Sequence, residues 1–518
     1  MTSRSGKRQN PLMNRMLNHY HRITGYDRHA MVPHSLDWEN QPSPCKIYQG
    51  LGGVDLADVS LLNDTLFSDV MESLTPAAAG RTMSLEALSR ACLLANGPTG
   101  RSRQGDGWFY YRSAPSAGAL YPNELYLVWP GAPDLEAGVY HVDVHNRRLT
   151  RLRRGGFAPF LRSACPAFGK AVRAVFVVSA LFFRSAWKYR KRAYRYVLLD
   201  GGHLAESTRL ALAAAGFSAS VVYDFNDAGL NRLLGLDEKR EGAIACIGIN
   251  GPAIPETPGT QDVDNLPGNV LQAGRVSSRE KIYPEIVKVH ADSSACGPSA
   301  AVPRIGANDL GLAIESWQPV SGSGGLRAAP WKMGYAEAVV RRRSRRNFVP
   351  ARLSAVQFSG LLESICRAYL SPDREHPAGA CGTICTGFLC RNAEGLEPGF
   401  YLVDPEKRQI GRAGSGDLTV AMTDACLNQA WLKNAALHFV FMTNLEILDQ
   451  DLGSRGYRHA MMSAGRLGHV LYLSATALGL GCCGIGAFYD REAEQILGLN
   501  PPSAMLYLVG VGPVPDRG

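Results

Sequence analysis

The chain has 518 residues and a formal net charge of +9, with 46% hydrophobic and 19% charged residues. This composition is typical of a globular protein of two to four domains and argues against a disordered or fibrous chain. The basic excess is interpreted as a solvated surface, with an anionic partner as the alternative. Basic residues are not interleaved with aromatic ones, so no nucleic acid partner is expected.

Residues 1–75 are expected to form an N-terminal arm, because the rest of the chain has no counterpart of that length. The N-terminus lacks the apolar stretch of a secretory signal, and no run reaches the roughly 18 apolar residues that span a bilayer. The 12 cysteines are too few for a disulfide scaffold in a chain of this size. We therefore expect a soluble cytoplasmic protein without a membrane partner.

The segment Pro115–Trp129, PSAGALYPNELYLVW, is the first informative motif of a predicted first domain, residues 76–250. Its small residues would let the backbone approach a flat ring, and an apolar strand follows them. The simpler alternative is a tight turn before a strand. The stretch GVYHVDVHNRRL, which begins at Gly138, is typical of a hairpin.

Lys188 and Tyr189 open the segment KYRKRAYRY and come just before a long apolar helix that is expected to end at Gly216. Either side chain can donate or accept a proton near a reacting centre, which makes the pair a candidate for acid–base catalysis. The alternative is a basic helix end that covers a carbonyl group or the surface.

Residues 251–330 are rich in Pro, Gly and Ser and are expected to form a linker and the arm that leads into a second domain, residues 331–518. In RRSRRNF, the residues Arg342, Ser344 and Arg346 alternate, so they share one side of an extended segment. Two guanidinium groups and a hydroxyl suit a phosphate. A solvated basic patch or the start of a helix is the alternative.

Cys381, Cys385 and Cys390 follow with a C-x3-C-x4-C spacing. This spacing lacks the C-x2-C pairs of zinc sites, and no matching histidine pair follows it. We predict ordinary thiols and no metal site.

An internal repeat organises the chain, because Tyr194–Leu236 and Tyr457–Leu499 overlay without a gap at an offset of 263 residues. The matched positions include Tyr194/Tyr457, Arg195/Arg458, Gly202/Gly465, Gly216/Gly479, Phe225/Phe488, Asp227/Asp490 and Gly235/Gly498. Each half is predicted to contain a helix, a strand, a hairpin strand, a strand, a long helix, a short glycine-rich strand, a short helix and a final strand. This order indicates an α+β fold. Two such domains are expected to pack as an intramolecular pseudo-dimer; independent domains on a string are the alternative.

The first half resembles the SagB/ThcOx-type peptide dehydrogenases of the FMN-dependent nitroreductase superfamily. The resemblance covers nearly all of residues 19–250 and includes YHRITGYDRHAM, WENQPSPCKIYQG, PSAGALYPNELYLV, GVYHVDV, KYRKRAYRYVLLDGGHLAE and FNDAGLNRLLGL. The second half, over about residues 335–515, resembles a general nitroreductase domain. The motifs that carry this resemblance are RRSRRNF, YRHAMMSAGRLGHVLYLSATALGLGCCGIGAF and LYLVGVG.

The resemblance implies two nitroreductase-like domains in tandem, with FMN in an interface of long helices and gripped by both domains. One domain would supply the phosphate grip and a glycine-rich turn beside the flavin ring, which here are Arg342, Ser344, Arg346, Gly484, Ile485 and Gly486, with Arg517 as a further cation. The other would cover the ring, which here falls to Pro115, Ser116, Ala117, Gly118 and Leu120. Lys188 and Tyr189 match the Lys-Tyr motif to which the family assigns catalysis.

Each half lacks what the other half has. AAAGRTMSLEAL, with only Arg81, stands where the first half would carry the arginine-rich segment, and AGACGTIC, from Ala378, stands where the second would carry PSAGALYP. The counterparts of Lys188 and Tyr189 are Asp451 and Leu452. One complete flavin site per chain is therefore predicted.

The leading functional hypothesis, implied by the resemblance, is FMN-dependent oxidation of thiazoline or oxazoline rings in a modified peptide, or in a related small molecule, to azoles. A cyclodehydratase is then a candidate partner. The alternatives are an NAD(P)H-dependent nitro, quinone or ene reductase and a non-catalytic scaffold of a biosynthetic complex. A monomer and a homodimer both fit, since the fusion can satisfy its own interface.

Overall fold

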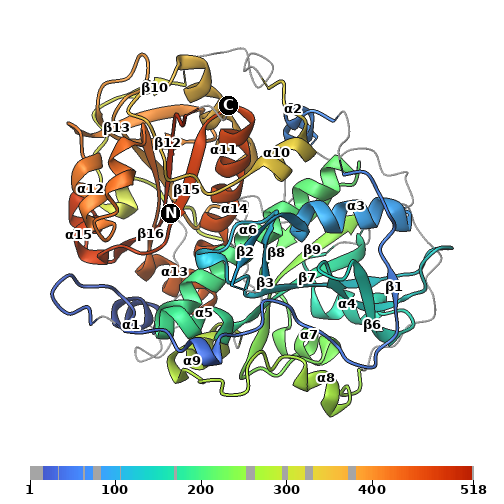
Figure 1. The fold of residues 1–518 in the computed structure, drawn as a ribbon. Helices are drawn as coiled ribbons and strands as arrows, with labels where there is room; N and C mark the ends of the chain where they lie inside the picture. Colours follow the sequence, from blue (N-terminus) through green and yellow to red (C-terminus); the bar gives the residue numbers. More distant parts are fainter. Residues whose placement is uncertain are drawn as a thin grey trace, which may run out of the picture.

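The protein contains two antiparallel seven-stranded sheets, each covered by helices, and a two-stranded sheet of β2 (Pro98–Gln104) and β3 (Gly107–Arg112) (Figure 1). The computed structural model describes residues 16–32, 34–61, 65–73, 83–105, 107–168, 172–251, 263–294, 302–320, 331–370 and 381–515. The mixed helices and strands confirm the α+β prediction.

The two sheets have equivalent strand orders, β1-β6-β5-β4-β7-β9-β8 and β10-β13-β12-β11-β14-β16-β15. The strands of the first are β1 (Gly53–Asp55), β4 (Asn123–Trp129), β5 (Gly138–Asp143), β6 (Arg148–Arg154), β7 (Val172–Leu181), β8 (Ala219–Val222) and β9 (Glu241–Asn250). Those of the second are β10 (Trp317–Pro319), β11 (Cys385–Cys390), β12 (Gly399–Asp404), β13 (Gln409–Ser415), β14 (Leu437–Asn444), β15 (Gly481–Ile485) and β16 (Ser503–Gly512). The predicted arm and linker thus each add an edge strand, β1 and β10, to a domain.

The helices repeat in the same way, with α3 to α7 matching α11 to α15. Domain 1 contains α3 (Leu85–Asn96), α4 (Ala158–Ala164), α5 (Phe182–Tyr189), α6 (Ala193–Ala214) and α7 (Asp227–Leu234). Domain 2 contains α11 (Ala355–Leu370), α12 (Thr419–Ala425), α13 (Leu445–Leu452), α14 (Arg455–Ala477) and α15 (Asp490–Ile496). The remaining α-helices are α1 (Met16–Ile23), α2 (Phe67–Glu72), α8 (Gly268–Gln272), α9 (Pro284–Ser294) and α10 (Tyr335–Arg341). Among the described residues, no helix combines the length and apolar character needed to cross a bilayer.

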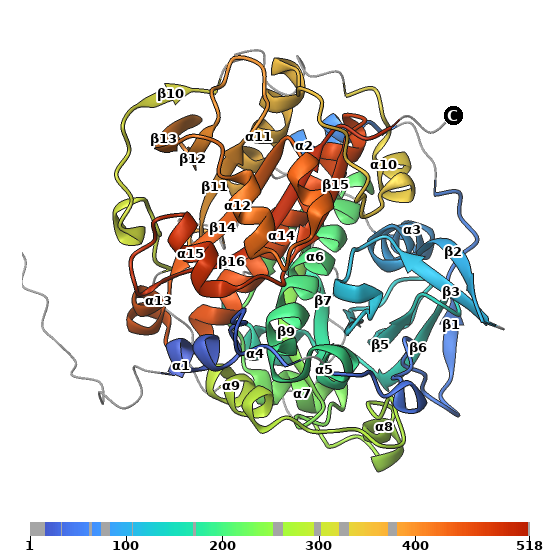
Figure 2. The ribbon, with the colours of Figure 1, turned by 60° about the vertical axis from the view of Figure 1, so that its left-hand side comes forward.

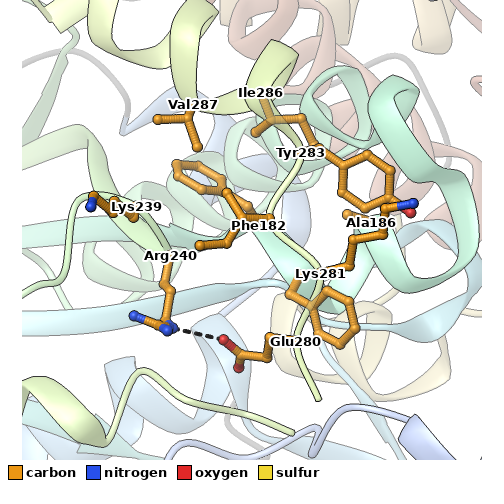
Figure 3. A pocket seen from close by; sticks show the side chains of 11 residues that line it. Phe182, Ala186, Lys239, Arg240, Glu280, Lys281, Tyr283, Ile286 and Val287 are labelled. Atoms are coloured by element: carbon orange, nitrogen blue, oxygen red, sulfur yellow. Dashed lines mark hydrogen bonds and ion pairs between the residues drawn. The ribbon is translucent and has the colours of Figure 1, made fainter.

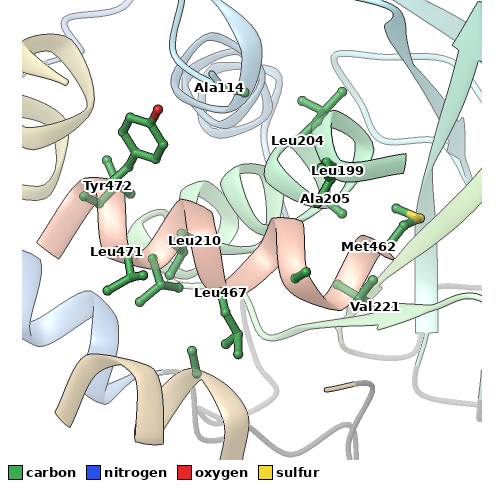
Figure 4. Packing of buried hydrophobic residues seen from close by; sticks show 14 of the residues in the cluster. Ala114, Leu199, Leu204, Ala205, Leu210, Val221, Met462, Leu467, Leu471 and Tyr472 are labelled. Atoms are coloured by element: carbon green, nitrogen blue, oxygen red, sulfur yellow. The ribbon is translucent and has the colours of Figure 1, made fainter. Parts of the chain in front are cut away.

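The long helices α6 and α14 lie side by side between the two sheets (Figures 1 and 2). They touch backbone to backbone at the matched glycines: a Cβ atom on Gly202 would lie 2.2 Å from the Met462 carbonyl oxygen, and one on Gly465 would lie 2.2 Å from the Leu199 carbonyl oxygen. Figure 4 shows Leu204 and other apolar side chains of both helices packed around this contact. The glycines therefore set the spacing of the pseudo-dimer.

Two buried ion-pair clusters join the domains reciprocally. Arg192 and Arg195 at the start of α6 bind Asp490 of domain 2, with an Arg192 Nη1–Asp490 Oδ2 distance of 2.7 Å. The equivalents displaced by 263 residues are Arg455, Arg458 and Asp227, which are bound in the same way. Removing one partner of a buried pair leaves an uncompensated charge, so losing either aspartate should be strongly destabilising.

Replacing Gly202 by alanine should lower the free energy of unfolding by about 1–3 kcal/mol, because the new methyl group meets a backbone oxygen that cannot move without separating α6 from α14. Gly268→Ala is the matched control, since nothing lies within 4 Å of its added Cβ atom. The measurement is denaturant unfolding of both variants. Equal midpoints for Gly202→Ala and wild type would show that the helices are not held this closely.

Candidate active site

The arginine-rich segment follows α10 as an extended chain. Ser344 forms a parallel bridge with Cys482 of β15, and the N–H of Arg345 donates to the Cys482 carbonyl at 2.9 Å. The extended interpretation is therefore confirmed, and the alternative of a helix start is wrong. Arg342 and Ser344 point to the same neighbour, Tyr472 of α14: the two hydroxyls are 3.0 Å apart, and the guanidinium lies 5.6 Å from the ring centre.

Arg342 reaches across the interface into domain 1. Its Nε donates to the carbonyl oxygen of Ser113 at 2.8 Å and its Nη2 to that of Arg112 at 2.9 Å. The residue is only 4% exposed, and burial lowers its pKa from the usual value. No carboxylate lies within ion-pair distance of it in the described part of the chain. A buried cation without a counter-ion favours an anionic group at this place.

Arg346 is exposed and lies 5.8 Å from the Trp431 ring. Burial raises the pKa of the Cys483 thiol, and the nearby Arg346 acts against that rise. Arg346 therefore lies between Trp431 and Cys483 of domain 2. Arg517, the third cation of the predicted grip, lies outside the described residues.

The segment Pro115–Tyr121, here called the cover loop, is fastened to α6 by Asp200. The Ser116 hydroxyl donates to this carboxylate at 2.6 Å and the Ala117 N–H at 3.0 Å, while the N–H of Tyr121 donates to the Ser116 Oγ at 2.9 Å. Burial raises the pKa of Asp200 to about 7, although the bonds from Ser116 and Ala117 act in the opposite direction. Pro115 is half-buried, and Leu120 packs against the apolar cluster around Trp187.

Lys188 and Tyr189 end α5 directly beneath the cover loop. A Cβ atom on Gly118, whose φ is +64°, would lie 2.8 Å from the Tyr189 hydroxyl and 3.3 Å from the Lys188 Nζ. Within the described residues, neither the Nζ nor the hydroxyl has a hydrogen-bond partner. Burial, Asp200 and Tyr26 together hold the pKa of Tyr189 above its usual value. Tyr189 is therefore a protonated hydrogen-bond donor at neutral pH.

Tyr196 connects this pair to the glycine-rich turn of domain 2. The Tyr189 and Tyr196 ring centres are 4.1 Å apart, and a Cβ atom on Gly486 would lie 2.8 Å from the Tyr196 ring. The Gly484 N–H donates to the Tyr472 hydroxyl at 2.7 Å, and Ile485 is buried in β15. The Gly486 carbonyl accepts from Arg192, and no described residue accepts a backbone hydrogen bond from the Gly486 N–H, which leaves this N–H for a ligand.

Together these contacts bring the predicted segments of both domains to one place in the interface. Sequence reasoning missed Asp200, Tyr196 and Tyr472, which position the predicted residues. It predicted the N-terminal arm but not the arm's contacts with the site, where the Tyr26 N–H donates to Asp490 and the His34 ring is hydrogen-bonded to the Lys188 carbonyl. The one available signal for Asp200 is a charged residue within the apolar run YVLLDGGHL.

The pseudo-symmetric position is built differently. The equivalents of Tyr472, His469 and His203 at an offset of 263 residues are Arg209, Glu206 and Arg466. The Nε atoms of Arg466 and Arg209 donate to the Glu206 Oε2 at 2.9 and 3.1 Å. Burial favours a raised pKa for Glu206, but the two arginines outweigh it and lower the pKa to about 2. Glu206 thus already occupies the two arginines at this position, where the other half of the interface has Tyr472 and two histidines.

A second sequence difference, a tyrosine in place of a glycine, reduces the space at the pseudo-symmetric position. The equivalent of Gly486 is Tyr223, whose ring lies 5.0 Å from the ring of His459. A tyrosine side chain occupies volume that a glycine leaves open. Arg81 and Ala378, which the sequence comparison of the two halves singled out, lie outside the described residues.

The pocket in Figure 3 lies between α5 and the linker segment 280–287. Its volume is about 10 Å³, which holds roughly one water molecule. Arg240 donates to Glu280 across it at 2.9 Å. The pocket is therefore a packing gap where the linker docks on α5, and it is too small for a substrate.

Comparison with known proteins assigns both halves. Residues 81–250 and 339–513 each match the nitroreductase family. A Methanocaldococcus jannaschii protein described as a nitroreductase is 30% identical over 179 residues, which cover 34% of this chain and 89% of the relative. A solved structure from Anabaena variabilis, also described as a nitroreductase, covers 96% of this chain and 99% of its own, with 25% identity and a TM-score of 0.76.

A chain of the Escherichia coli microcin synthetase complex aligns with 48% of this chain and 95% of its own at 17% identity, with a TM-score of 0.30 that is too low to bear on function. The two matches within the chain and the full-length likeness to the Anabaena protein agree with the paired sheets. The chain belongs to the nitroreductase family, carries two family domains in tandem, and is an oxidoreductase.

Proposed function

We propose that the chain binds one FMN between its domains and uses it to oxidise azoline rings of a modified peptide, or of a related small molecule, to azoles. The residues present suit this cofactor. Arg342 and Arg346 lack carboxylate partners among the described residues, and they flank the Ser344 hydroxyl, as a phosphate requires. Gly118 and Gly486 let the backbone of both domains pack closely against Tyr189 and Tyr196, because a Cβ atom at either position would lie 2.8 Å from the tyrosine.

FMN, when bound, supplies the acceptor for a hydride. The protein must also remove a proton from the ring carbon next to the one that loses the hydride, so that a double bond forms between the two carbons. The Lys188 Nζ is available for this step because no described residue binds it. The protonated Tyr189 hydroxyl can orient the ring heteroatom by donating a hydrogen bond.

The observation that carries the proposal is the position of two unpartnered polar groups, the Lys188 Nζ and the Tyr189 hydroxyl, beneath the cover loop at Gly118. Both residues are half-buried, so the two polar groups remain accessible to a reacting partner at the domain interface. The Lys-Tyr resemblance to SagB/ThcOx-type dehydrogenases supports the same assignment. A cyclodehydratase that forms azolines would supply the substrate.

A second candidate function is reduction of nitro, quinone or ene compounds by NAD(P)H. The descriptions of the Methanocaldococcus and Anabaena relatives as nitroreductases favour it. Both functions use the same site, and the direction of electron flow distinguishes them. A non-catalytic scaffold is disfavoured by the assignment to an oxidoreductase family.

The test is to measure flavin content and turnover on the same preparation. Flavin released by denaturation should equal one FMN per chain, because the Arg209–Glu206–Arg466 cluster and Tyr223 close the other position. A thiazoline peptide should be converted to its thiazole with loss of two mass units. Two FMN per chain would overturn the asymmetric site, and rapid bleaching by NADPH without peptide oxidation would favour the reductase.

A further inference from the structure

A cavity of about 370 Å³ lies beside the cover loop, on domain 1. The hairpin of β2 (Pro98–Gln104) and β3 (Gly107–Arg112) forms one wall. The lining residues are Pro44, Cys45, Pro98, Trp108, Phe109, Tyr110, Arg112, Tyr121, Val144 and His145. This volume falls within the range of small-molecule sites, roughly 300–1,000 Å³.

Aromatic side chains dominate the walls. The Phe109 and Tyr121 rings are nearly parallel, at 25° and 6.4 Å between centres, and Tyr110 meets His145 edge to face at 5.1 Å. Trp108 is 53% exposed. Flat apolar groups pack well against such faces and edges.

One charged group lines the same cavity. Arg112 is only 7% exposed, its Nη2 donates to the Pro44 carbonyl at 2.8 Å, and its guanidinium lies 4.9 Å from the Tyr121 ring centre. No carboxylate within the described residues forms an ion pair with it. A buried guanidinium in this state has unused donors and an uncompensated charge.

The nearby carboxylates are engaged elsewhere. Glu124 is bound by Arg184, and by His141 at 2.9 Å. Asp143 accepts hydrogen bonds from the N–H groups of His145 and Asn146 at 3.1 and 3.0 Å. Arg112 helps to lower the pKa of Glu124 but forms no ion pair with either carboxylate, so its guanidinium remains accessible to an anionic ligand.

We propose that this cavity binds an aromatic group that carries a carboxylate, with the ring between the aromatic walls and the carboxylate on Arg112. The cavity adjoins the candidate active site, because the Arg112 carbonyl accepts from Arg342 and Tyr121 is hydrogen-bonded to Ser116 of the cover loop. The assignment of this cavity to the non-reacting part of the substrate rests on the proposed function. The binding of an aromatic carboxylate rests only on the residues that line the cavity.

The test uses isothermal titration of the purified full chain with indole-3-acetate and its neutral amide. The acid should bind at least about tenfold more tightly than the amide, because a charge-assisted contact is lost in the amide. Arg112→Gln should abolish this preference, and Trp108→Ala should weaken both ligands. Arg103→Gln removes an exposed charge from the same hairpin and should behave as wild type.

Equal binding of acid and amide by the wild type, or an unchanged preference in Arg112→Gln, would overturn the proposal. If Arg112→Gln does not fold, the wild-type comparison and Trp108→Ala decide. A short peptide ending in phenylalanine, with a free or amidated C-terminus, distinguishes a peptide carboxylate from a free acid. Flavin content and thiazoline turnover are measured in parallel, so failure of this site and failure of the proposed oxidation give different results.

Discussion

Replacing Arg342 and Arg346 together by alanine should yield a folded chain that purifies with little FMN. Each charge-assisted contact contributes roughly 1.5–3 kcal/mol, so two lost contacts weaken binding by about 3–6 kcal/mol. At about 1.4 kcal/mol per tenfold, this corresponds to roughly 10²–10⁴ in the dissociation constant. The measurements are flavin released by denaturation and titration of the apoprotein with FMN.

The single variants of Arg342 and Arg346 distinguish the loss of a phosphate-binding charge from a loss of contacts between the domains. Arg342 also binds two carbonyls of domain 1, so its loss can loosen the interface, whereas the exposed Arg346 makes no such bond in the described residues. Arg346→Ala should therefore weaken FMN binding without a change in the thermal midpoint. Arg345→Ala is the control, because it also removes one positive charge, but from a side chain that donates to Asn347 and is not part of the predicted phosphate grip. A double variant that stays fully loaded would place the phosphate elsewhere.

The tandem fold is predictable from the sequence because helix packing restricts residues that recur at a constant offset. Gly202 and Gly465 are such a pair, since each must allow the other helix's backbone to approach. Asp227 and Asp490 are another, because each receives two arginines from the opposite domain. The packing of α6 on α14 and the pairing of each aspartate restrict both halves in the same way, so identical residues occur at equivalent positions of the two halves.

The way the site is held together is less predictable, because it depends on contacts between segments far apart in the chain. Ser116 and Asp200 are separated by 84 residues, and nothing in either motif indicates their hydrogen bond. The glycine-rich turn predicts the same role for Gly484 and Gly486, yet the Gly484 N–H donates to the Tyr472 hydroxyl. Arg342 has the spacing of a phosphate ligand and also serves as a bond between the domains, which its motif does not indicate.

Substituting Lys188 by alanine should leave the fold and the FMN content unchanged and reduce thiazoline oxidation by roughly 10²–10⁴-fold, the usual contribution of a general acid–base group. Its Nζ lies at the cover loop and has no described partner whose loss would destabilise the chain. Lys191→Ala, at an exposed position three residues on, is the matched control and should keep wild-type turnover.

The Tyr189→Phe variant tests the contribution of the hydroxyl group to turnover separately from that of the aromatic ring. Phenylalanine keeps the 4.1 Å ring contact with Tyr196, so the wall of the site persists, while the hydroxyl proposed to orient the substrate is lost. Turnover should fall with retained flavin. Asp451→Ala, at the pseudo-symmetric equivalent of Lys188, should have no effect, because its side of the interface lacks the complete site. Wild-type rates in both Lys188→Ala and Tyr189→Phe would show that the pair is structural, and the chemistry would then need another proton acceptor.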